Sequence, residues 1–311
     1  MRRVETGKEI FQPDDVEEPI DTWFHRPIAA ILVDLLYHTP ISPNQLTAIS
    51  GICGIAAGIC LALADRNSVW LVGIAGGFIF LSVIFDCCDG QLANLKGEAS
   101  LAGRALDGGV DAVVITSVMF GFFVFLVNLG YEPVSTFGFG FAAGYSWRRQ
   151  AEGFDFAKQR FIANTSSAPL RNSLPTLEEI KAERQRVLGD GQYTMAFFVS
   201  VFEAYTKTQR KRGRGKVIGL ERSRMDDQEL RRSYRTEFLP QMRLWAWNGV
   251  GTHQFLMYMT AFLSLLWPPL ILVTWSIMIF PLNILAVISH VWGIRIENRL
   301  WSQLKGDAKL A

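Results

Sequence analysis

Residues 69–129 read VWLVGIAGGFIFLSVIFDCCDGQLANLKGEASLAGRALDGGVDAVVITSVMFGFFVFLVNL. Two apolar stretches, 69–88 and 101–129, flank a short polar segment. Each is about as long as the roughly 20 residues that an α-helix needs to cross a bilayer. Acidic residues gather where the two stretches adjoin. The sequence therefore predicts two antiparallel membrane spans joined by a short turn, with carboxylates at their adjoining ends.

The four aspartates have helical spacing. Asp86 and Asp89 are three residues apart, and Asp107 and Asp111 are four apart. Residues at these spacings share one face of a helix, so four carboxylates are expected to converge. Like charges in an apolar bundle repel one another and are costly to bury. Divalent cations remove this cost, and ligands that are all oxygen favour Mg²⁺, Mn²⁺ or Ca²⁺ over zinc. The pattern indicates a two-metal phosphoryl site.

Small residues surround these acids. Gly90, Gly103 and Ala93 allow a ligand or another backbone to approach closely. Ordinary helix packing explains Gly108 and Gly109 equally well.

Further spans are expected on both sides of this stretch. The candidates are residues 45–63, 134–147, 250–267 and 269–290. Six spans place the N-terminal tail, the loop with Lys96, the segment 149–243 and the C-terminal tail on one side. These segments carry most of the basic residues, so that side is predicted to be cytoplasmic. Trp147 and Trp245 are expected at the membrane interface.

The chain thus divides into five parts. Residues 1–23 form a polar tail, 24–148 an interfacial amphipathic helix and spans one to four, and 149–243 a basic cytoplasmic segment. Residues 244–293 form spans five and six, and 294–311 a C-terminal tail. The expected fold class is an all-α integral membrane bundle of about six transmembrane helices.

The segment 149–243 holds about 20 of the 31 basic residues. Its apolar patch 193–205 favours a buried or interfacial helix over a span, because it is short. The basic run 210–216 is interpreted as a topology signal, with anionic lipid binding as the alternative. No nucleic-acid partner is expected.

The cysteines argue against a zinc site or a disulfide framework, and the N-terminus argues against a cleaved signal peptide. Cys53, Cys60, Cys87 and Cys88 lie in apolar stretches without the spacing of a zinc site or a disulfide framework. The tail has no apolar core, so it is not expected to be a cleaved signal peptide.

The sequence resembles the CDP-alcohol phosphotransferase family. The family signature is Asp, two residues, Asp-Gly, two residues, Ala-Arg, eight residues, Gly, three residues, Asp, three residues, Asp. This chain keeps every spacing, with the matching residues Asp86, Asp89, Gly90, Ala93, Asn94, Gly103, Asp107 and Asp111. The upstream SPNQLT at 42–47 is similar to the start of the family's first span.

The resemblance implies a reaction and a set of roles. Asp86, Asp89 and Asp107 would hold Mg²⁺ or Mn²⁺, with Asp111 shared at the second ion. Asp111 would also act as general base on the acceptor hydroxyl. Gly90, Ala93, Asn94 and Gly103 would line the pocket for the CDP-linked donor. CMP would leave after in-line attack by the acceptor alcohol, and a CDP-diacylglycerol-like donor is favoured. Family members are often dimers, so a homodimer is left open.

One position departs from the signature, because Asn94 stands where the family has Arg. Asn lacks the charge that strengthens a hydrogen bond to phosphate. Lys96 or Arg104 would take its place, or the donor differs. Two other functions stay open: a cation transporter or channel, whose acids would be spread through the membrane depth, and a catalytically inactive membrane scaffold.

Overall fold

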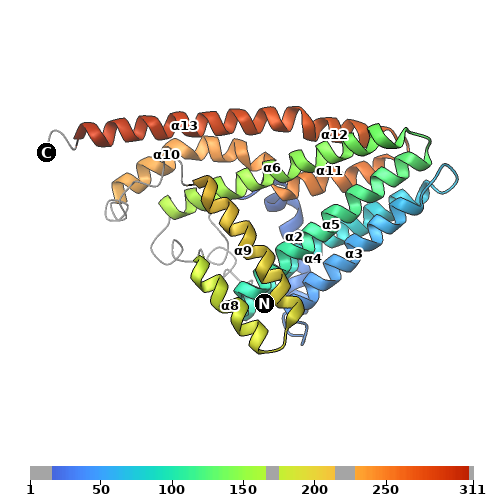
Figure 1. Ribbon diagram of the computed structural model, residues 1–311, viewed down its shortest axis with the longest axis horizontal. Helices are drawn as coiled ribbons and strands as arrows, with labels where there is room; N and C mark the ends of the chain where they lie inside the picture. The colour runs from blue at the N-terminus through green and yellow to red at the C-terminus, as the bar shows by residue number, and fades with distance from the viewer. Residues whose placement is uncertain (1–15, 166–174, 214–227, 308–311) are drawn as a thin grey trace.

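The computed structural model describes residues 16–165, 175–213 and 228–307. Every regular element within these ranges is a helix (Figure 1). The elements are η2 (Asp21–His25), α2 (Arg26–Leu36), α3 (Pro43–Leu63), α4 (Trp70–Lys96), α5 (Leu101–Asn128), α6 (Pro133–Thr165), α8 (Leu177–Gly189), α9 (Tyr193–Gly213), α10 (Gln228–Trp245), η4 (Ala246–Asn248), α11 (Val250–Leu263), α12 (Leu270–Ile279) and α13 (Pro281–Asp307). The all-α membrane fold expected from the sequence is confirmed.

Four helical segments in the described chain are long and apolar enough to cross a membrane. They are Pro43–Leu63, Trp70–Lys96, Leu101–Asn128 and Leu270–Leu300. The last one joins α12 and α13 across Pro281. Helix α11 has 14 residues, fewer than the roughly 20 of a usual span. Six spans therefore remain a prediction.

Helices α3, α4 and α5 pack closely through small residues. Ser42 caps α3, because its side chain accepts from Gln45 N and its own N–H donates to Gln45 Oε1. A Cβ added to Gly54 would lie 2.5 Å from Val114, and one added to Gly58 would lie 2.6 Å from Ser117 O. Only glycine permits this approach between α3 and α5.

The N-terminal segment lies across the bundle as an amphipathic element. On α2, Ala29 and Val33 are buried against α4, whereas Ile31 and Leu35 are exposed. The preceding π-helical turn is fastened by His25, whose ring nitrogens lie 2.7 Å from Asp21 Oδ1 and 3.1 Å from Tyr258 Oη. One apolar face is thus left for a membrane surface, as expected for an interfacial helix.

Helix α6 does not end at Trp147 but continues to Thr165. Trp147 and Trp245 are 3% and 6% exposed, so the sequence-based placement of both at the interface is wrong. Trp147 instead stacks on His253 with ring centroids 5.3 Å apart. Tertiary packing against α11 buries a side chain whose neighbours Arg148 and Arg149 resemble a membrane boundary.

The segment after α6 contributes a helical hairpin, α8–α9, that packs on α5. Ile180, Val187, Ala196 and Val199 are buried with Ala102 and Ala105 of α5. Glu203 of α9 joins the two hairpin helices through an ion pair with Arg184 of α8, and it also pairs with Lys207 of its own helix. The predicted buried or interfacial helix at 193–205 is therefore confirmed as part of α9. The basic run 210–216 begins in the last residues of α9, and its residues 214–216 lie outside the described part of the chain.

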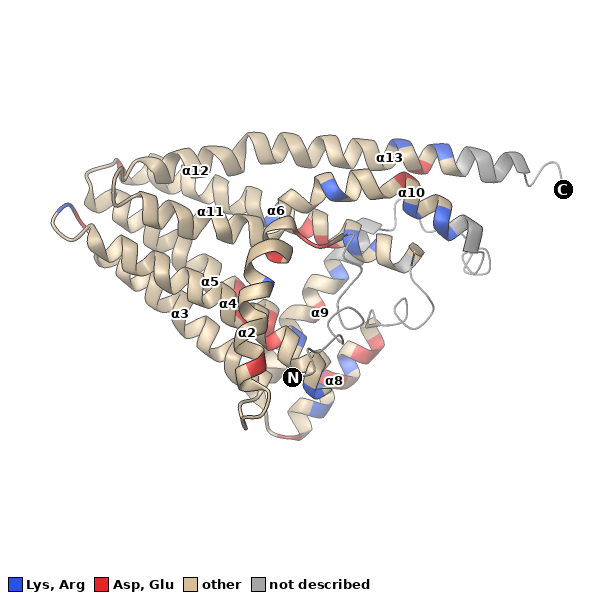
Figure 2. Cartoon of the chain, turned by 180° about the vertical axis from the view of Figure 1, so that it is seen from behind, with Lys and Arg blue, Asp and Glu red and all other residues tan. Residues whose placement is uncertain are grey.

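Charged residues concentrate at one end of the bundle. In Figure 2, Lys, Arg, Asp and Glu gather around α2, α8, α9, α10 and the adjoining part of α13. The opposite ends of α3, α4, α5, α11 and α12 are almost free of colour except for one loop. This asymmetry places the aspartates of α4 and α5 at the charged end.

Candidate metal and phosphate site

A four-residue connection brings the aspartate pairs together. Helix α4 ends at Gly97, whose φ of 67° lies in the left-handed region that glycine adopts without strain. Helix α5 begins after Ser100, whose side chain accepts from Gly103 N at 3.0 Å. Because both caps stop their helices sharply, α4 and α5 run antiparallel and their acidic ends face each other.

Three carboxylates meet at this junction. Oxygen atoms of Asp86, Asp89 and Asp107 all lie within 4.8 Å of one another. Asp107 Oδ1 is buried and has no hydrogen-bond partner among the described residues. In the part of the chain that the structure describes, none of these aspartates forms an ion pair with Lys or Arg. A divalent cation with oxygen ligands fits this donor set and would satisfy the orphaned oxygen.

Asp111 lies beside this group but not within it. It is one helical turn after Asp107 on α5. Its charge acts on Asp86 and Asp89, so it faces the same volume. Three of the four aspartates therefore have oxygen atoms close to one another, whereas the fourth, Asp111, interacts with two of them through its charge.

A bond from α3 supports the site and was not found from the sequence. Thr47 Oγ1 donates to Asp89 Oδ2 at 2.5 Å, and both side chains are buried. Such a bond orients a metal ligand and tunes its basicity. The available signal was the SPNQLT stretch itself, which places Thr47 one turn inside a capped helix.

The small residues divide into two kinds. A Cβ added to Gly90 or Gly108 would meet nothing within 4 Å, so both leave open space beside the aspartates. A Cβ added to Gly109 would lie 2.1 Å from Phe198 of α9. Gly109 therefore serves packing on the far side of α5, whereas Gly108 lies on the open side.

The proposed donor-pocket residues lie on the same open side. Gly90 and Asn94 are exposed on α4, and Ala93 is partly exposed. A Cβ on Gly103 would lie 3.4 Å from Asn44 Oδ1 at the start of α3. Gly90 and Asn94 are thus exposed one helical turn apart on α4, and their place in a donor pocket remains a prediction.

Asn94 stands where the family has Arg, and Lys96 and Arg104 are the two basic residues that could replace that arginine. The structure distinguishes between them. Lys96 Nζ donates to Thr39 O at 2.9 Å and to Ile41 O at 2.7 Å, so it holds the connection between α2 and α3. Arg104 is exposed, and its charge acts on Asp107. Only Arg104 of this pair is placed to meet an anion at the site.

The fold and the site define an all-α membrane protein with a carboxylate centre at the ends of two spanning helices. Residues 40–143 match the model of the CDP-alcohol phosphatidyltransferase family. This segment is about a third of the chain, and it contains the four aspartates together with Thr47, Gly90, Ala93, Asn94 and Gly103. In this segment the chain is similar to that family.

A curated relative points the same way. A protein named bifunctional IPC transferase and DIPP synthase, from Rubrobacter xylanophilus, is 32% identical over 91 residues. The aligned part covers 28% of this chain and 19% of the relative. The chain thus aligns with about a fifth of that protein's length.

Proposed function

We propose that this protein transfers a phospho-alcohol group from a CDP-alcohol to a second alcohol, with release of CMP. The observation that carries the proposal is the cluster of Asp86, Asp89 and Asp107 oxygens within 4.8 Å, inside the segment that matches the family. Four acids that form no ion pair among the described residues suit a site that binds cations and phosphates together.

Each residue has a stated role. Asp86, Asp89 and Asp107 would hold Mg²⁺ or Mn²⁺, with Asp111 shared at a second ion. Such ions, when bound, would supply the positive charge that a pyrophosphate needs for in-line displacement. Gly90, Ala93, Asn94 and Gly103 line the pocket for the CDP group, and Thr47 fixes the orientation of Asp89.

The reaction balances as a substitution at phosphorus. The acceptor oxygen forms a new bond to the β-phosphorus while the bond from that phosphorus to the CMP oxygen breaks. Asp111 accepts the proton of the acceptor hydroxyl. A carboxylate is a weak base, so its contribution rests on position and on acidification of the hydroxyl at the site.

A lipid donor suits the location of the site. The aspartates lie in the adjoining halves of α4 and α5, on the side of the bundle where charged residues concentrate, so a lipid and a water-soluble alcohol would both have access. We favour a CDP-diacylglycerol-like donor with a polyol or phosphorylated polyol as acceptor, which would serve phospholipid synthesis. The charged end of the bundle would face the cytoplasm together with both termini. A homodimer is compatible with this arrangement.

The grouping of the acids disfavours a transporter. An ion path requires acids through the membrane depth, whereas these aspartates gather at one end of α4 and α5 (Figure 2). A scaffold has no need of a metal-binding cluster.

The test is a CMP-release assay on the purified protein in detergent. It uses a panel of CDP-alcohols and acceptors with Mg²⁺, Mn²⁺ or EDTA, beside an Asp111→Asn variant. We expect metal-dependent CMP release that the variant loses. Folded protein that binds metal and releases CMP from none of the pairs would contradict the proposal.

A further inference from the structure

One face of α5 is covered by protein at its start and bare further along. Ala102, Gly109, Val113 and Phe120 are spaced by seven, four and seven residues, so they share one side of a helix with about 3.6 residues per turn. Val113 and Phe120 are exposed, and both lie in a segment long and apolar enough to span a membrane. In a membrane that α5 spans, this bare part of the face contacts lipid.

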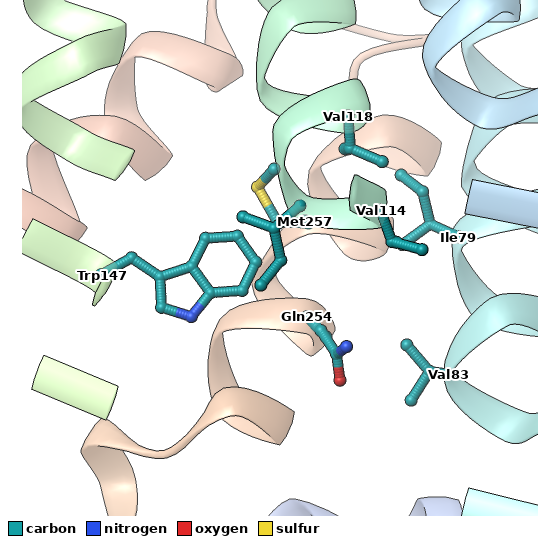
Figure 3. A pocket seen from close by; sticks show the side chains of 8 residues that line it. Ile79, Val83, Val114, Val118, Trp147, Gln254 and Met257 are labelled. Carbon is teal, nitrogen blue, oxygen red and sulfur yellow. The ribbon is translucent and has the colours of Figure 1, made fainter. Parts of the chain in front are cut away.

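The opposite side of α5 packs inside the bundle. Val114 and Val118 are buried. Figure 3 shows both valines lining an apolar space together with Ile79 of α4 and Met257 of α11. The face that carries Val113 therefore points outward.

The α8–α9 hairpin covers the start of the outward face (Figure 1). Ala102 and Ala105 of α5 are buried together with Ala196 of α9. Phe198 of α9 occupies the space that a Cβ on Gly109 would need. The bare part of the face begins one helical turn after Gly109, so α9 lies directly beside the place where α5 meets lipid.

The outer side of α9 is apolar at this boundary. Tyr193, Phe197 and Val201 are 75%, 63% and 47% exposed, and their spacing of four residues places them in one stripe. Within the described residues 193–204 the charged side chain is Glu203, which is buried. Large apolar side chains lose free energy of burial when they stay in water. The stripe therefore indicates contact with another surface.

Helix α8 of the same hairpin has the opposite character. Its exposed side chains include Glu178, Lys181, Gln185 and Arg186. Such a surface suits water. The hairpin thus presents one polar and one apolar side, as elements at a membrane surface do.

We propose that the outer face of α9 lies on the lipid bilayer, with Tyr193, Phe197 and Val201 at the boundary between headgroups and acyl chains. Aromatic side chains are enriched at this depth. Phe197 directly precedes Phe198, whose ring reaches Gly109 at the edge of the lipid-contacting face. This continuity favours lipid over a protein partner. The bilayer then holds the first turns of α5 at the depth of the headgroups.

The test places a photo-reactive benzophenone amino acid at position 197 of the full chain, in nanodiscs of phosphatidylcholine and phosphatidylglycerol. Val113 is the reference position in the spanning part of α5. Gln185, exposed on α8 of the same hairpin, is the matched control. After irradiation, mass spectrometry identifies what each position has captured. The measurement needs no turnover, so its outcome is separate from that of the CMP-release assay.

We expect lipid adducts at positions 197 and 113 and none at position 185. Lipid at position 113 without lipid at position 197 would overturn the proposal. A cross-link from position 197 to a second copy of the chain, or to another part of the same chain, would overturn it as well.

A second measurement follows access from water. Phe197→Cys and Gln185→Cys are compared in nanodiscs for the rate of reaction with a charged maleimide, and the unsubstituted chain gives the background of its own cysteines. We expect slow labelling at position 197 and fast labelling at position 185. Equal rates at the two positions would contradict the contact of α9 with the bilayer.

Discussion

Besides the N-terminal segment with Glu17 and Glu18, two regions of the molecule hold buried or half-buried carboxylates, and the partners of these carboxylates differ. In the region formed by α6, α8, α9 and α13, Glu297 pairs with Arg160, Glu152 with Arg148, and Glu203 with Arg184 and Lys207. At the junction of α4 and α5, Asp86, Asp89 and Asp107 have no such partner among the described residues and lie against one another. The first set is neutralised by the chain itself, whereas the second requires cations from outside. We therefore expect the aspartates to serve the proposed metal site and the glutamates to stabilise the fold.

The largest expected effect is on CMP release, and it tests the difference between the two regions directly. Asp89→Asn removes a metal ligand, so CMP release should fall well beyond the 10- to 100-fold that loss of an outer-shell partner costs. The matched variant Glu297→Gln should keep CMP release and lower the unfolding temperature, because it leaves Arg160 without its partner. Equal loss of activity in both variants would show that the two regions do not differ in this way.

The second-largest effect is expected for the hydrogen bond from Thr47 of α3 to Asp89. Thr47→Val keeps the shape of the side chain and removes the bond to Asp89, so the apparent Kd for Mn²⁺ should rise about 10-fold. Thr116→Val is the control, since Thr116 Oγ1 donates only to Ala112 O of its own helix. An unchanged Kd for the Thr47 variant would remove this residue from the site.

Substitutions at Arg104 test whether this residue supplies the positive charge that Asn94 lacks. Arg104→Ala should raise the KM for the CDP donor about 10-fold with little change in kcat, as expected for a charge-assisted hydrogen bond to phosphate. Lys96→Ala should leave this KM unchanged, because Lys96 holds backbone carbonyls of the connection between α2 and α3. Adding Asn94→Arg to Arg104→Ala should restore the KM. Failure of this rescue together with an effect of Lys96→Ala would reverse the assignment.

The sequence predicted the catalytic region better than the rest of the chain for physical reasons. The capping of α3 by Ser42 and the convergence of Asp86, Asp89 and Asp107 follow from residue spacing along the chain. Because the connection between α4 and α5 is short, residues near each other in sequence are also near each other in the fold. The contact of Phe198 with Gly109 and the bond from Thr47 to Asp89 join residues far apart in sequence. No local pattern encodes such pairs.

The same limit explains the errors about Trp147 and Trp245. An aromatic residue beside arginines is typical of a membrane boundary, but the outcome depends on what packs against it. Helix α6 continues past Trp147, and α11 covers the indole with His253.

Helix packing in the catalytic region gives a further test. Gly58→Ala places a Cβ 2.6 Å from Ser117 O, so it should destabilise the protein by about 1–3 kcal/mol through overpacking. Gly77→Ala, in the same bundle but with nothing within 4 Å of the added Cβ, should be neutral or slightly stabilising. Thermal unfolding in detergent measures both. Similar effects of the two substitutions would contradict the close approach of α3 and α5.

The smallest expected effect concerns a buried acid without a function at the site. Burial raises the pKa of Glu18 to about 8 from its ordinary value of 4.5, and the nearby Asp21 charge adds to this. The folded chain therefore holds a proton that the unfolded chain releases, so this stabilisation is complete below pH 4.5 and is lost as the pH rises through 8. Glu18→Gln should raise the unfolding temperature at pH 8.5 and leave it nearly unchanged at pH 4.5. A larger gain at the lower pH would contradict the assignment.

The central claim is that the unpaired aspartates bind divalent metal in order to transfer a phospho-alcohol group. It is tested most directly by titrating Mn²⁺ into one sample and following the bound ion by electron paramagnetic resonance and CMP release from CDP-diacylglycerol together. The account predicts that activity rises with occupancy of the site and that Asp89→Asn lowers both. It also predicts that Asp111→Asn loses activity while Mn²⁺ still binds at the group formed by Asp86, Asp89 and Asp107. CMP release without bound Mn²⁺, or Mn²⁺ binding unchanged by Asp89→Asn, would contradict it.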